Sequence, residues 1–186
     1  MKNLLFTIAL LISFSSFGQS SKTYISVETP DGADKYEKLN AYNKAIKNYP
    51  DRGYLYSRRG HIKWQLFNDL EAALVDYNNA VKLANDDKSI INVLSHLGII
   101  NSELGNYYDA IYAYTRAIEA WSAFSDAYFE RGNIKLKMGD LKGACQDWKK
   151  AIEVADLDDD IPQVELRYLR HTLKLSQEQI DKNCNP

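Results

Sequence analysis

The sequence predicts an all-α protein in which antiparallel helix hairpins stack as an α-solenoid. The first observation is a local pattern of an aromatic residue, a small residue three positions later, and then a β-branched residue. Its four copies are Tyr42, Ala45 and Ile46; Tyr77, Ala80 and Val81; Tyr114, Ala117 and Ile118; and Trp148, Ala151 and Ile152. The alanines follow one another at steps of 35, 37 and 34 residues. Periods of this size are typical of α-solenoids.

Two further registers run in phase with the first. Gly60, Gly98 and Gly132 recur at a similar period, and each is followed twelve or thirteen residues later by an alanine, namely Ala73, Ala110 and Ala144. Two helices approach closely only where the side chains at their crossing are small. We therefore expect these residues to lie where paired helices cross, and the Tyr and Trp rings to fill the gap between neighbouring hairpins.

Residues 127–132 (Ala-Tyr-Phe-Glu-Arg-Gly) and 139–144 (Gly-Asp-Leu-Lys-Gly-Ala) carry a resemblance to the tetratricopeptide repeat family, which extends over roughly residues 34–156. The resemblance implies a right-handed superhelix of units of about 34 residues, each made of two antiparallel helices. It places three repeats at 51–156, preceded by a half repeat at 34–50 that acts as an N-terminal capping helix.

The departures from a regular repeat fall mainly in polar loops, where solenoids tolerate insertions. One extra residue lies near 67–69, where the usual turn glycine is also missing, and three lie around 85–88. The aromatic residue that the family often has three positions after the glycine is replaced by Lys63, Asn101 and Lys135.

The first eighteen residues are predicted to be a signal peptide outside the fold. A short basic head with Lys2 precedes an apolar run at 4–14, and small residues at 16–18 flank a cleavage site before Gln19. A retained membrane anchor is the competing interpretation, but the apolar run falls well short of the ~20 residues that a spanning helix needs. We therefore expect an exported protein, periplasmic or secreted, with no membrane insertion after cleavage.

The segments that flank the repeats are predicted to be a tether and two caps. Residues 19–33 are expected to form a flexible linker, with Asp34 as the N-cap of the first helix. Residues 157–186 are expected to form C-terminal capping helices, the first starting at Asp160 with Pro162 in its first turn and Gln163 closing a capping box. Residues 176–179 would begin a further short turn, and these elements would seal the open end of the stack.

Charge and cysteine content limit which classes of partner and which cellular compartment are expected. The formal net charge of −2 argues against nucleic acid or an anionic membrane surface as the main partner. The two cysteines, Cys145 and Cys184, are expected to pair in an exported protein. Small exported bacterial proteins of the resembled family also end in a cysteine after a Gly-Ala-Cys segment. A buried Cys145 with a free tail thiol is the alternative.

No constellation of residues in the sequence indicates an enzyme, a cofactor or a metal. His61 and His96 fall on first helices of adjacent repeats, but two imidazoles without a carboxylate or thiolate make an incomplete zinc site. Residues 156–160 space carboxylates as a calcium loop begins, yet Ile161 stands where the loop needs glycine and Arg167 where it needs glutamate. We therefore predict no catalytic residue, no metal and no cofactor.

The resemblance implies a concave groove lined by the first helix of each repeat. Its predicted residues have spacings of three and four: Tyr54, Arg58, His61, Trp64, Asn92, His96, Ile99, Asp126, Phe129, Glu130 and Asn133. Aromatic and aliphatic anchors lie between Arg58 at one end and two carboxylates at the other, and this pattern suits a peptide or a partner protein. The carboxylates disfavour a receptor for acidic chaperone tails.

The sequence thus predicts a non-enzymatic adaptor that binds a protein partner through this groove. Four alternatives stay open: solvated helix faces without a binding role, binding through a convex surface, a structural subunit of an envelope assembly that docks through the stack edge or tail, and an enzyme or sugar-binding protein. The oligomeric state is not predicted.

Overall fold

The structure is a computed structural model that describes residues 26–29, 31–84, 87–155 and 163–184. Within these residues it has eight α-helices and no β-strand. The helices are α1 (Lys35–Asn48), α2 (Gly53–Phe67), α3 (Leu70–Leu83), α4 (Asp87–Glu103), α5 (Tyr107–Ala120), α6 (Ser125–Lys137), α7 (Leu141–Ala155) and α8 (Gln163–Asn183). The predicted signal peptide at 1–18 and linker residues 19–25 and 30 lie outside the described residues.

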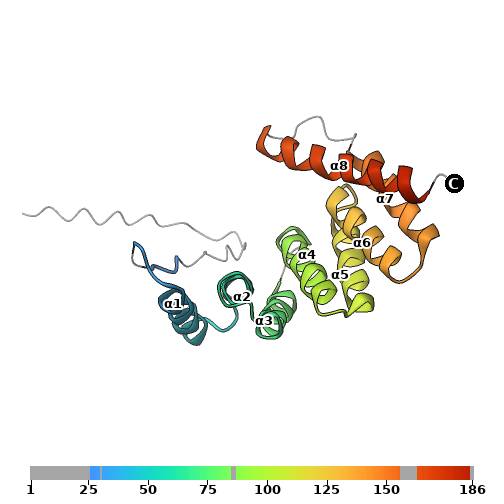
Figure 1. Ribbon diagram of the computed structural model, residues 1–186. Coiled ribbons are helices and arrows are strands. Elements are labelled where there is room, and N and C mark those ends of the chain that lie inside the picture. The colour runs from blue at the N-terminus through green and yellow to red at the C-terminus, as the bar shows by residue number, and fades with distance from the viewer. Residues whose placement is uncertain (1–25, 30, 85–86, 156–162, 185–186) are drawn as a thin grey trace, which may run out of the picture.

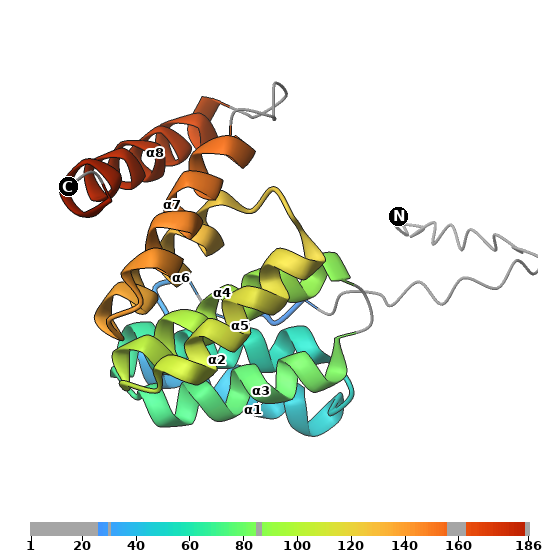
Figure 2. The ribbon, with the colours of Figure 1, turned by 90° about the vertical axis from the view of Figure 1, so that its right-hand side faces the viewer.

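Consecutive helices pack against one another along the stack. α2 pairs with α3, α4 with α5 and α6 with α7, while α1 packs against α2. Figure 1 shows α1 to α7 arranged one after another, and Figure 2 shows α8 crossing the C-terminal end of this array. The predicted all-α solenoid is therefore confirmed, and α8 contacts α6 as well as α7.

The three repeat glycines lie at equivalent contacts within their hairpins. An ideal Cβ placed on Gly98 would lie 2.5 Å from Cζ of Tyr114, and one on Gly132 would lie 2.7 Å from Nε1 of Trp148. At Gly60 the same atom would lie 3.4 Å from Cδ2 of Tyr77. Each ring fills the space left by the glycine of its own hairpin, and the Tyr77 ring also meets the next hairpin, where its centroid lies 5.2 Å from that of His96 on α4.

The turns after the first helices use a left-handed residue to end each helix. Gly105 and Gly139 take this conformation, with φ of 78° and 83°. At the turn that lacks a glycine, Asn68 has φ of 53°, and its N–H donates to the carbonyl of Trp64. Asparagine is the side chain that most readily replaces glycine here, which explains how this turn forms without one.

The N-cap predicted at Asp34 is confirmed. Its carboxylate accepts from the backbone N–H of Tyr36 at 2.7 Å and of Glu37 at 2.9 Å. The Glu37 carboxylate in turn accepts from the Asp34 N–H at 2.9 Å, which completes a capping box. These bonds satisfy N–H groups that have no partner within the helix.

The C-terminal cap is one helix within the described residues, where more than one was expected. α8 continues through residues 176–179, because the Ser176 side chain is fully buried and Ile180 is 7% exposed, so packing holds this turn in the helix. The capping box expected at Asp160 and Gln163 depends on residues outside the described range.

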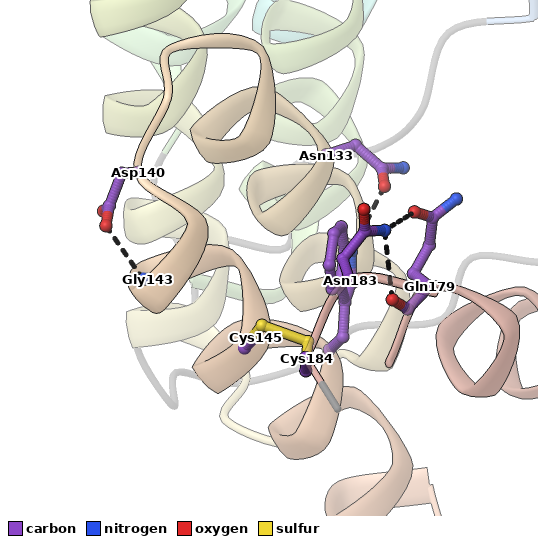
Figure 3. Close-up of a disulfide and its surroundings, with 8 residues drawn as sticks. Asn133, Asp140, Gly143, Cys145, Gln179, Asn183 and Cys184 are labelled. Carbon is purple, nitrogen blue, oxygen red and sulfur yellow. Dashed lines mark hydrogen bonds between the residues drawn. A yellow bond between two sulfur atoms is a disulfide. The ribbon is translucent and has the colours of Figure 1, made fainter. Parts of the chain in front are cut away.

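A disulfide joins Cys145 on α7 to Cys184 just after α8, with their Cα atoms 5.8 Å apart (Figure 3). Beside it the Asn183 side chain donates to the Gln179 side chain at 2.9 Å and to the Gln179 carbonyl at 3.1 Å, which closes the last turn. A bridge across a separation of 39 residues stabilises the fold by about 3–4 kcal/mol in the chain-entropy model.

Candidate functional site

Three residues predicted for the groove form what we call the ring cluster: His61 and Trp64 on α2, and His96 on α4. The ring centroids of His61 and His96 lie 5.8 Å apart, and those of Trp64 and His96 lie 5.6 Å apart. Tyr77 of α3 is fully buried, with its ring centroid 5.2 Å from that of His96. His61 is exposed, whereas Trp64 and His96 are half-buried.

Two buried polar atoms of this region have no hydrogen-bond partner among the described residues: Nδ1 of His96 and the hydroxyl of Tyr77. Burial lowers the pKa of His96, and the nearby His61 lowers it further. Burial also raises the pKa of Tyr77, with a further rise from the charge of Asp76. Both groups are therefore neutral at pH 7, and each has capacity for a hydrogen bond that the fold does not use.

The other predicted groove residues of this part also lie on α2 and α4. Arg58 and Asn92 are exposed, and Tyr54 and Ile99 are half-buried. This part of the predicted groove therefore offers a cation, an amide and partly exposed apolar surface beside the ring cluster.

The part of the predicted groove on α6 is different, because α8 packs against α6. Phe129 is only 7% exposed, so it belongs to the core and is not an exposed anchor for a ligand. The hydroxyl of Thr172 on α8 donates to the Asp126 carboxylate at 2.7 Å. The prediction of Phe129 as an exposed anchor is wrong, while Asp126 is half-buried and bonded to α8, which was expected to cap the end of the stack and also packs against α6.

Glu130 and Asn133 also have roles within the fold. Asn133 accepts a hydrogen bond from Nε1 of Trp148 at 3.1 Å, and its amide donates to Glu130 at 3.4 Å. Burial raises the pKa of Glu130, and the charge of Asp126 adds to this rise. The predicted groove residues on α6 therefore orient the Trp148 ring and contact α8, whereas the exposed residues of the predicted groove, Arg58, His61 and Asn92, lie on α2 and α4.

Sequence reasoning missed two buried ion networks, which we call the charge triads. In the first, Arg59 donates through Nε and Nη2 to Asp76 at 2.8 and 2.6 Å, and Lys63 lies 2.8 Å from the same carboxylate. The Asp76 side chain is fully buried, so both cations are needed to offset the loss of its hydration. The pairing of Arg59 is bidentate, the strongest geometry for such a bond.

The second charge triad has the same composition as the first and lies two hairpins further along the chain. Arg131 donates to Asp147 at 2.9 and 2.7 Å, and Lys135 lies 2.8 Å from the same carboxylate. In both cases the arginine also reaches the preceding hairpin, where Asn43 on α1 and Thr115 on α5 accept from Nη1 at 2.9 Å. Each arginine therefore connects three helices.

A signal for these triads is present in the sequence. An arginine directly precedes Gly60 and Gly132, a lysine follows each glycine by three positions, and an aspartate directly precedes Tyr77 and Trp148. The two lysines occupy the positions where the repeat often has an aromatic residue, so the apparent departure marks an ion pair.

The described residues contain no group of three or more His, Cys, Asp or Glu side chains placed to hold a metal ion. Among them, no helix combines the length and the apolar character that crossing a bilayer requires.

The family model described as Tetratricopeptide repeat matches residues 125–156. A crystal structure of MamA is similar to the chain with a TM-score of 0.58 and 21% identity, over 81% of this chain and 91% of that one. A tetratricopeptide repeat protein from Parabacteroides merdae has a TM-score of 0.61 and 20% identity, over 82% of this chain and 57% of that one. No curated protein sequence matches the chain.

A chain of the APC/C hetero-tetramer Cut9–Hcn1 is also similar, with a TM-score of 0.60 and 13% identity, over 77% of this chain and 26% of that one. Together these findings define the fold class as an α-solenoid. Within that class, residues 125–156 carry a tetratricopeptide repeat, and the fold of the described residues is similar to that of tetratricopeptide repeat proteins.

Proposed function

We propose that this protein is a non-enzymatic adaptor that binds a peptide or partner protein through the part of the concave groove formed by α2 and α4. It acts outside the cytoplasm, in the periplasm or as a secreted protein, after removal of residues 1–18. The export step rests on the basic head, short apolar run and small residues of the N-terminal segment. The disulfide between Cys145 and Cys184 suits an oxidising compartment.

The observation that carries the proposal is the ring cluster, which brings His61, Trp64 and His96 together on α2 and α4. Partly exposed Trp64 supplies the kind of aromatic surface that dominates binding energy at interfaces. Exposed His61 extends this surface, with its ring centroid 6.1 Å from that of Trp64. An apolar side chain of a partner that packs over Trp64 and His61 fits this surface.

The part of the groove on α2 and α4 is short, and its length limits the size of the ligand. Because α8 packs against α6, the partner contacts α2 and α4 and does not run along the whole row of first helices. Exposed Arg58 at the α2 end favours a ligand with an acidic group on that side. A short extended segment of a partner protein therefore fits better than a long helix.

A capture experiment from the native envelope tests the proposal, with Trp64→Ala as the variant. We expect this variant to retain less than a tenth of the partner that wild type captures, because alanine removes an aromatic anchor. Trp121→Ala is the matched control, since Trp121 is 44% exposed in the turn between α5 and α6, outside the groove. Circular dichroism should be the same for all three proteins.

Equal capture by the Trp64→Ala variant and wild type would contradict the proposal. It would favour the alternative of a structural subunit that docks through the stack edge or tail. Crosslinking in the native envelope, followed by light scattering of the extracted material, would then show a large assembly instead of a small complex.

A further inference from the structure

The middle repeat lacks the charge triad that its two neighbours share. Leu97 stands where the first and third repeats have arginine, and Asn101 stands where they have lysine. Ala113 replaces the buried aspartate. All three substitutes are buried, with 6%, 6% and 4% exposure respectively. Since the three changes occur together, no charge is left unpaired in the core of this hairpin.

These shorter side chains leave a cavity of about 320 Å³ between α3, α4 and α5. All three replaced positions line it, and so does Asn78 of α3, which corresponds in the repeat to the Asn43 that accepts from Arg59. No residue of the predicted groove lines the cavity. It is therefore a separate site, and it does not depend on the proposed function.

The wall of the cavity supplies acceptors for a cation. Asn78 offers an amide oxygen, and so does Asn101, whose Oδ1 also accepts from the Asn106 side chain at 3.4 Å. The exposed carboxylate of Asp109 lies one helical turn before Ala113 on α5 and forms no ion pair with any side chain that the structure describes. Asp109 can therefore pair with a cation that enters the cavity, although the aspartate of each charge triad is buried one turn further along its helix.

The other end of the same wall has the opposite charge. Arg116 follows Asp109 by seven residues, a rise of about 10 Å along the helix. Its guanidinium lies 5.9 Å from the centroid of the Tyr112 ring and forms no ion pair with a described acidic side chain. A ligand with a cation at one end and an acidic group at the other would satisfy both charges.

We propose that this cavity binds an arginine side chain from outside the chain, whose guanidinium takes the place that Arg59 and Arg131 occupy in the flanking repeats. The guanidinium donates to Asn78 and Asn101 and pairs with Asp109, while a carboxylate of the same ligand pairs with Arg116. The arginine comes either from the free amino acid or from a segment of a partner protein.

Titration of the isotope-labelled full-length chain, followed by NMR of its backbone amides, tests this site with three probes. They are L-arginine, L-citrulline as the isostere with a neutral side chain, and the peptide acetyl-Gly-Arg-Glu-amide, whose glutamate supplies the carboxylate. We expect L-arginine or the peptide to shift amides of α3, α4 and α5 with saturation, and L-citrulline to bind at least tenfold more weakly, because it lacks the charge. Tighter binding of the peptide would identify a partner protein as the source, and tighter binding of L-arginine would identify the free amino acid.

Two variants test whether arginine binds in this cavity. Asp109→Asn should weaken arginine binding about tenfold, because it removes one charged hydrogen-bond partner. The triple variant Leu97→Arg, Asn101→Lys and Ala113→Asp installs the charge triad in the cavity and should abolish binding with the helical circular dichroism retained. If the triple variant does not fold, the Asp109→Asn variant decides. Equal binding of L-citrulline, an unchanged affinity in Asp109→Asn, or no saturable shift would overturn the proposal.

Discussion

At the residue scale, the fold depends on how closely each repeat glycine approaches a ring. The Tyr114 and Trp148 rings are 2% and 0% exposed, so neither can move aside for an added methyl group. At Gly60 the nearest atom to an added Cβ is Cβ of Asp76 at 3.2 Å, which is a milder contact. The three glycines are therefore equivalent in position but unequal in the space around them.

This difference predicts an order of stability among three alanine variants. Gly98→Ala and Gly132→Ala should each lower the free energy of unfolding by about 1–3 kcal/mol through overpacking. Gly60→Ala should change it by less than about 1 kcal/mol, because the higher helix propensity of alanine offsets the tighter contact. Urea unfolding followed by circular dichroism measures all three, and a Gly60→Ala variant less stable than the other two would contradict the packing described.

At the scale of the elements, the charge triads decide how neighbouring hairpins are fixed to one another. Each triad buries a carboxylate with two cations, and its arginine also bonds to the preceding hairpin. The middle hairpin keeps the same pairing of helices, with neutral side chains in the same positions. Buried ion pairs contribute little net stability compared with a well-packed apolar alternative, but removing one partner is costly.

The neutral residues of the middle hairpin therefore predict how stability changes when a charge triad is replaced by the corresponding neutral residues. Asp76→Ala should lower the free energy of unfolding by about 2–3 kcal/mol. This loss is smaller than for a fully buried ion pair, because the cations that lose their partner are partly exposed to water. The triple variant Arg59→Leu, Lys63→Asn and Asp76→Ala should stay within about 1 kcal/mol of wild type. Denaturant unfolding compares them, and a triple variant that is less stable than the single one would show that the triad is not exchangeable.

Some elements could be predicted from the sequence because their cause is local. The glycine register, the N-cap at Asp34 and the repeat period all rest on residues close together in the chain, and the structure agrees with them. The charge triads could also have been found by aligning the repeats, since Arg59 and Arg131 stand at the same register position. Their burial does not follow from one repeat alone, because each arginine connects three helices.

The packing of α8 against α6 could not be predicted in the same way. Phe129 and Asp126 have the helical spacing of groove residues, and that spacing does show which face of the helix they occupy. Whether the face is open depends on α8, whose Thr172 meets Asp126 across 46 residues of sequence. A contact at this separation follows from packing of the whole chain and leaves no local pattern.

At the scale of the whole molecule, the C-terminal helix sets which part of the groove remains available. The disulfide joins α7 to the residue after α8, and the packing of α8 on α6 and α7 closes one end of the row of first helices. Two separate sites remain beyond this closed end: the ring cluster on α2 and α4, and the cavity between α3, α4 and α5. The proposed adaptor role depends on the first of these alone.

Photo-crosslinking of the captured partner tests this central proposal most directly. A photoreactive amino acid is placed in turn at Arg58 and Asn92 in the groove, at Tyr108 on α5, and at Gln177 on α8, all of which are exposed. The adaptor proposal predicts crosslinks to one partner from the positions of Arg58 and Asn92, and none from the other two. Crosslinks from Tyr108 or Gln177 with none from the groove positions would contradict it.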